Sequence, residues 1–143
     1  MEGRRIAAAA LAGSALLLAA CSGSPQSVCP AVGWINVVAV RVDGSTQAVG
    51  LVDRVEFCDD TQCSQGPDEI PDTSSVLPYV AEEVGPGHWR ISIDMSSPES
   101  ATIRALDAEG RELAATTEPL VWERVGGSEQ CGGPGSAEVS IAL

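Results

Sequence analysis

Residues 89–95, Trp-Arg-Ile-Ser-Ile-Asp-Met, are the stretch that decides the fold of this chain. The odd-numbered positions, from Trp89 to Met95, are apolar, and the even-numbered positions between them are polar. Successive side chains of a β-strand point to opposite faces of a sheet, so this alternation predicts a strand with one face in a core and the other in solvent. The chain is therefore expected to bury its apolar side chains between sheets.

Short alternating or β-branched segments also occur on both sides of this strand. Further strands are expected at residues 32–43, 49–58, 79–84, 101–106, 111–117, 120–125 and 137–143. Turn sequences separate several of them, at residues 43–46, 85–88 and 107–110, and Asp53 interrupts the alternation of the second segment. No window holds a sustained helical period, so helix should be nearly absent. Seven to eight short strands with regularly spaced turns predict an all-β fold, an antiparallel β-sandwich.

The hairpin at residues 103–113, Ile-Arg-Ala-Leu-Asp-Ala-Glu-Gly-Arg-Glu-Leu, resembles those of the small immunoglobulin-like or prealbumin-like domains of bacterial surface lipoproteins. The resemblance implies a sandwich with one of these two topologies. The chain departs from true immunoglobulin domains because no Trp lies midway between two core cysteines, so no functional residue is carried over. Sandwiches of this kind support many unrelated functions, and the fold by itself selects none.

The first twenty residues have the composition of a secretory leader. Arg4 and Arg5 form a positive region, and Ile6 to Ala20 is an uncharged apolar run of fifteen residues. Such a run is too short to span a bilayer comfortably and is typical of a signal peptide. The leader ends in Leu18-Ala19-Ala20-Cys21, which resembles the lipobox of bacterial lipoproteins at every position. An ordinary signal peptide that is cut elsewhere is the alternative interpretation.

The lipobox resemblance implies cleavage between Ala20 and Cys21, a thioether-linked diacylglycerol on Cys21, and acyl chains such as palmitate. Residues 1–20 are then the lipoprotein signal peptide, 21–28 the lipidated cysteine with a flexible tether, and 29–143 the β-sandwich domain. Two acyl chains suffice for stable attachment at ~0.8 kcal/mol per buried CH₂. We expect a protein that is tethered to the outer, extracytoplasmic face of the cell membrane.

Four cysteines remain once Cys21 is assigned to lipid: Cys29, Cys58, Cys63 and Cys131. An even set in an oxidising compartment predicts two disulfides. Three connectivities are possible. The short spacing of Cys58 and Cys63, with Cys29 and Cys131 flanking the first and last strands, favours Cys58–Cys63 together with Cys29–Cys131. A zinc site made of the same thiols is the alternative, but they lack paired C-x₂-C spacing.

The chain carries a formal net charge of −12, and its eight basic residues are all arginine. Without residues 1–20 the formal charge is −13. A lysine-free acidic surface repels phosphate backbones and anionic headgroups, so binding to nucleic acid is not expected. A protein or cationic partner in the envelope fits this charge better, and the oligomeric state is left open. Abundant Ala and Gly without Lys is typical of a high-GC genome such as that of an actinobacterium.

The sequence holds none of the common catalytic motifs: no Gly-x-Ser-x-Gly elbow, no phosphate-binding glycine loop and no His-Glu-x-x-His. Its single histidine, His88, lies in the predicted turn before Trp89. We therefore expect a lipid-anchored binding or accessory module of the bacterial envelope, not an enzyme, with no cofactor. The alternatives are an envelope hydrolase that uses Asp or Glu side chains with His88, and a purely structural surface domain.

Two further segments are candidates for binding. Acidic side chains that could supply oxygen ligands to Ca²⁺ are Asp59, Asp60, Asp68, Glu69 and Asp72. They lack the Asp-x-Asp-x-Asp order of a calcium loop, so a solvated acidic loop without metal is the favoured interpretation. The glycine-rich residues 126–135 are either a recognition loop or, as we favour, slack that lets Cys131 reach Cys29.

Overall fold

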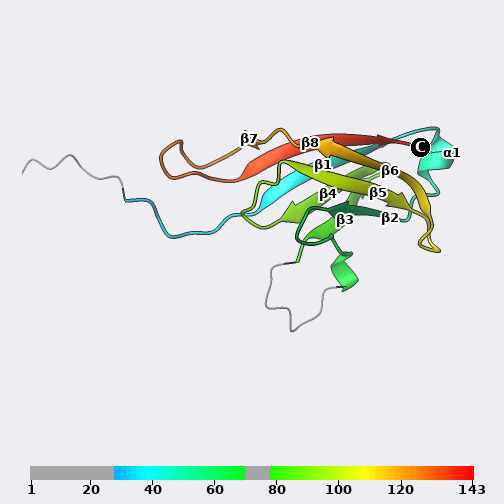
Figure 1. The fold of residues 1–143 in the computed structure, drawn as a ribbon, viewed down its shortest axis with the longest axis horizontal. Coiled ribbons are helices and arrows are strands. Elements are labelled where there is room, and N and C mark those ends of the chain that lie inside the picture. The colour runs from blue at the N-terminus through cyan, green and yellow to red at the C-terminus, as the bar shows by residue number, and fades with distance from the viewer. Residues whose placement is uncertain (1–27, 70–77) are drawn as a thin grey trace, which may run out of the picture. The chain divides into compact units, whose positions relative to one another are not determined.

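Two β-sheets make up the part of the chain that the structure describes (Figure 1). The structure is a computed structural model that describes residues 28–69 and 78–143. Ala31–Leu143 form one compact unit. Its elements are β1 (Asn36–Asp43), α1 (Thr46–Val49), β2 (Arg54–Cys58), η2 (Pro67–Glu69), β3 (Val80–Gly85), β4 (His88–Ile93), β5 (Ser100–Leu106), β6 (Glu112–Pro119), β7 (Glu123–Arg124) and β8 (Gly135–Ala142).

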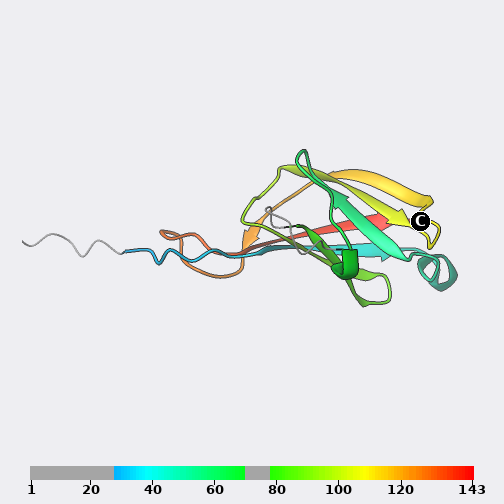
Figure 2. The ribbon, with the colours of Figure 1, turned by 90° about the horizontal axis from the view of Figure 1, so that it is seen from below.

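The two sheets lie one over the other as the layers of a sandwich (Figure 2). The five-stranded sheet has the order β3-β4-β1-β8-β7, and the three-stranded sheet has the order β2-β5-β6. The predicted all-β sandwich is therefore confirmed. One pairing differs from the antiparallel expectation, because β1 and β8 are parallel. After β1 the chain alternates between the sheets: β2 lies in the three-stranded sheet, β3 and β4 return to the sheet of β1, β5 and β6 complete the other sheet, and β7 leads into β8 beside β1.

The core lies between the sheets and is formed by side chains at alternate positions of the strands, which point inward. Its buried members include Val38, Val40 and Val42 of β1, Val55 and Phe57 of β2, Trp89, Ile91 and Ile93 of β4, Ala101, Ile103 and Ala105 of β5, and Ala137 and Ile141 of β8. The alternation of residues 89–95 holds as far as Ile93. Met95 is 48 % exposed instead of buried, because β4 ends at Ile93 and Asp94 accepts a hydrogen bond from the Ser96 N–H in the following turn.

The strand expected at residues 49–58 is wrong in its first half. Thr46–Val49 form the short helix α1, which begins at Ser45, whose Oγ accepts a hydrogen bond from the Ala48 N–H at 3.1 Å. A serine at this position satisfies a backbone donor that the helix leaves unpaired. The strand β2 begins only at Arg54, directly after Asp53, the residue that interrupts the alternation.

Other predicted boundaries also shift. The strand expected at 120–125 is reduced to the two residues of β7, and β1 begins at Asn36 instead of Val32. The hairpin between β5 and β6 is confirmed, and Gly110 has a φ of 76°, which a glycine adopts without steric strain. Within the described ranges, no helix has the length and apolar character needed to cross a bilayer.

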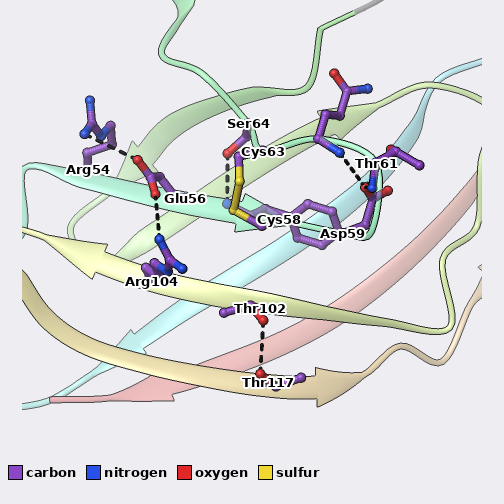
Figure 3. Close-up of a disulfide and its surroundings, with 12 residues drawn as sticks. Arg54, Glu56, Cys58, Asp59, Thr61, Cys63, Ser64, Thr102, Arg104 and Thr117 are labelled. Atoms are coloured by element: carbon purple, nitrogen blue, oxygen red, sulfur yellow. Dashed lines mark hydrogen bonds and ion pairs between the residues drawn. A yellow bond between two sulfur atoms is a disulfide. The ribbon is translucent and has the colours of Figure 1, made fainter.

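Both predicted disulfides are present. Cys58 at the end of β2 is bonded to Cys63 with an S–S distance of 2.02 Å (Figure 3), and Cys29 and Cys131 are disulfide-bonded as predicted. Beyond the short bridge, Ser64 pairs with Phe57: its N–H donates to the Phe57 carbonyl and its Oγ accepts from the Phe57 N–H. The leader, the lipobox with Cys21, and residues 22–27 lie outside the described residues.

Candidate functional site

The outer face of the five-stranded sheet has a small residue between two long charged ones. In the strand register, Ala39 of β1 lies opposite Arg90 of β4 on one side and opposite Glu138 of β8 on the other. The backbones of Arg90 and Glu138 are therefore two strand spacings apart, or about 10 Å. Because the methyl group of Ala39 cannot fill the space between these long side chains, the surface is hollowed there.

This depression, the Ala39 hollow, has a volume of about 570 Å³. The side chains around it come from β1, β3, β4 and β8; they are Val37, Ala39, Arg41, Val84, His88, Arg90, Glu138 and Ser140. Val84 lies at the bulge of β3 and is 56 % exposed. The hollow thus joins apolar surface to three basic side chains and one carboxylate.

The two arginines of the Ala39 hollow are each held by one carboxylate that lies away from Ala39. Arg41 donates through Nε to Asp43 at 2.8 Å, and Asp43 is the next outward residue of β1. Arg90 donates through Nη2 to Glu82 on the outer strand β3 at 2.7 Å. With exposed fractions of 61 % and 53 %, these arginine side chains keep donors for another acceptor.

Glu138 differs from the other carboxylates near the Ala39 hollow. It is exposed on β8, and within residues 28–69 and 78–143 it makes no ion pair and no side-chain hydrogen bond. It is also the one acidic residue among those that line the hollow. The β8 side of the hollow therefore carries a carboxylate with no ion pair among the described residues, and the side formed by β1 and β4 carries two guanidinium groups that each have one carboxylate partner.

His88 is the first residue of β4, not part of the preceding turn, which consists of Pro86 and Gly87. It lies opposite Arg41, and Ser140 lies on the other side of Arg41. The strand β1 therefore separates His88 from Ser140. In the described part of the chain no hydrogen bond joins His88 to a hydroxyl or a carboxylate.

The candidate calcium ligands that the structure describes form no metal-binding group. Asp59 Oδ1 accepts hydrogen bonds from the N–H groups of Thr61 and Gln62, and Glu69 accepts from Arg54. Asp60 and Asp68 are exposed, and Asp72 lies outside the described residues. Among the residues that the structure describes, no group of three His, Cys, Asp or Glu side chains could hold a metal ion.

Asp59 instead belongs to a polar network that the sequence did not reveal. The buried Tyr79 donates its hydroxyl to Asp59 Oδ2 at 2.8 Å and lies 3.0 Å from Ser96 Oγ. Burial opposes ionisation of Asp59, but the hydrogen bonds from Thr61, Gln62 and Tyr79 outweigh it and lower the pKa of Asp59. Burial raises the pKa of Tyr79. No local pattern signals this network, since its members come from three separate loops.

The glycine-rich residues 126–135 form a defined turn in addition to connecting β7 to β8. The Ser128 N–H donates to the Gly132 carbonyl at 2.9 Å, and Gly127 and Gly132 have φ values of 71° and 73°. A Cβ on Gly132 would lie 3.1 Å from the ring of Trp34. These glycines are therefore required for a tight turn and for close packing, besides any role in letting Cys131 reach Cys29.

The outer face of the three-stranded sheet is different, because it carries a connected set of ion pairs (Figure 3). Glu56 of β2 lies between Arg54 and Arg104, at 3.4 and 3.9 Å. Arg54 also contacts Glu69, and Arg104 contacts Glu112. We call these residues the Glu56 network.

Comparison with protein-family models, with curated proteins and with solved structures finds no match to this chain.

Proposed function

We propose that this protein is a lipid-anchored, extracytoplasmic binding module of the bacterial cell envelope, and that it binds its ligand in the Ala39 hollow. The lipobox-like Leu18-Ala19-Ala20-Cys21 supports the anchor. The anchor would hold the sandwich next to the membrane through a short tether. Neither nucleic acid nor a resident cofactor is needed for this function.

The observation that carries the binding proposal is the state of the charges in the Ala39 hollow. Glu138 has no ion pair among the described residues, and both Arg41 and Arg90 keep free donor capacity. In the Glu56 network, by contrast, the carboxylate lies between two arginines. Polar groups that stay available around a hollow are typical of a binding site, where a few of them fix the orientation of a ligand.

The anchor is tested by detergent partitioning and intact-mass analysis of the full-length protein expressed in a bacterial host. We expect the mature protein to enter the detergent phase and its mass to show cleavage before Cys21 with a diacylglycerol attached. The Cys21→Ala variant should stay unprocessed or be released in soluble form. Cleavage at another residue without lipid would contradict the anchor.

The binding face is tested by photo-crosslinking in intact cells of the native host. A photoreactive amino acid at Ser140, beside the Ala39 hollow, is compared with one at Thr117, on the outer face of the three-stranded sheet. We expect a discrete crosslinked product from position 140 and none from position 117. Equal labelling from both positions, or labelling from position 117 alone, would contradict the proposed face.

A further inference from the structure

We infer that the ligand of the Ala39 hollow is dipolar: a zwitterionic, peptide-like molecule whose carboxylate binds the arginines and whose ammonium group binds Glu138. This inference rests on the proposed function and names the chemistry of the same site. It follows from the separation of opposite charges on the two walls of the hollow.

The positive wall is suited to a carboxylate. Asp43 engages Nε and Nη2 of Arg41, at 2.8 and 3.3 Å, which leaves Nη1 to donate to a ligand. Glu82 engages Nη2 of Arg90 and leaves Nε and Nη1. Guanidinium groups donate in a fixed fork that matches a carboxylate. The partners Asp43 and Glu82 orient both forks and draw them away from Ala39, which keeps the hollow open.

The negative wall is suited to an ammonium group. Glu138 lies across Ala39 from Arg90, and no basic side chain of the described residues pairs with it. A ligand that carried a carboxylate alone would lie close to Glu138 and be repelled by it. An ammonium group at the other end of the ligand removes this repulsion and adds an attraction.

The floor between the walls accepts a short apolar spacer. Ala39 and Val37 belong to β1, and Val84 adds exposed apolar surface from β3. The two charged walls are about 10 Å apart at the backbone, and both sets of side chains extend over the floor. A spacer of several methylene groups, or a short stretch of peptide, therefore fits better than a compact zwitterion such as glycine.

The test uses defined probes and nuclear magnetic resonance titration of the folded domain with both disulfides intact. The probes are 6-aminohexanoate, hexanoate, hexylammonium and glycine. We expect 6-aminohexanoate to shift the amide signals of residues 37–41, 88–90 and 138–140, and to bind about two- to fivefold more tightly than hexanoate, the ratio expected for one exposed ion pair. Glycine and hexylammonium should bind more weakly than 6-aminohexanoate.

Glu138→Gln should remove the advantage of 6-aminohexanoate over hexanoate, whereas Glu112→Gln in the Glu56 network should not. Equal binding of the two probes by the unmodified domain, or an undiminished advantage in Glu138→Gln, would overturn the dipolar ligand. If no probe shifts these signals but the crosslink from position 140 persists, the dipolar ligand is wrong and the binding face stands. Loss of both results would contradict the proposed function itself.

Discussion

The outer faces of the two sheets carry the same kinds of side chains in opposite arrangements. On the three-stranded sheet, the carboxylate of Glu56 lies in the middle, between Arg54 and Arg104. On the five-stranded sheet the carboxylates that hold the arginines lie at the rim, and Ala39 occupies the middle. The first face pairs its carboxylates with its arginines, although the buried Nε of Arg54 has no partner within the described residues. The second face has a hollow lined by Glu138, which has no ion pair among the described residues. Position in the register, more than composition, separates the face with paired charges from the face that we propose binds a ligand.

The largest expected effect is that of removing a disulfide, which lowers the stability of the core that both sheets share. Chain-entropy estimates are ~4.7 kcal/mol for the long Cys29–Cys131 loop and ~2 kcal/mol for the Cys58–Cys63 loop. We predict that Cys29→Ser/Cys131→Ser lowers the melting temperature clearly more than Cys58→Ser/Cys63→Ser. Calorimetry under non-reducing conditions measures both. Equal shifts would show that loop length does not govern the loss.

The next prediction compares one carboxylate from each face. Glu56→Gln removes the central charge of the Glu56 network and leaves Arg54, whose buried Nε already has no partner within the described residues, with a weaker contact. We expect a loss of about 1 kcal/mol in the free energy of unfolding. Glu138→Gln should change that free energy by less than about 0.5 kcal/mol, because Glu138 has no ion pair to lose. Urea denaturation measures both, and similar losses would remove the contrast between the faces.

The next prediction concerns stability at low pH. Asp59 accepts the hydrogen bonds that hold the loop after β2 of the three-stranded sheet. Its pKa in the folded protein lies below the ordinary value of 3.8. The stabilisation is therefore complete above pH ~4 and is lost as the pH falls through the folded pKa. We predict that Asp59→Asn reduces the steepness of acid unfolding, followed by near-ultraviolet circular dichroism below pH 4. An unchanged acid profile would show that Asp59 does not stabilise the folded state through its charge.

The strands were largely predictable from the sequence, but the hollow was not. Alternation at residues 89–95 and 137–143 predicted β4 and β8, because the period of a strand is a property of adjacent residues. Which residues lie opposite one another depends on the turns and on packing between distant strands. The position of Ala39 between Arg90 and Glu138, and the parallel pairing of β1 with β8, arise at that level.

The most direct test of the binding face fills the hollow and compares the result with the same change on the other face. Ala39→Phe places a ring between Arg90 and Glu138, and Ala115→Phe places one on β6, opposite Arg104. Both positions are exposed, so both variants should fold and keep their melting temperatures within a few degrees. We predict that Ala39→Phe abolishes the photo-crosslink from position 140 and Ala115→Phe leaves it intact. An undiminished crosslink in folded Ala39→Phe would contradict binding in the Ala39 hollow.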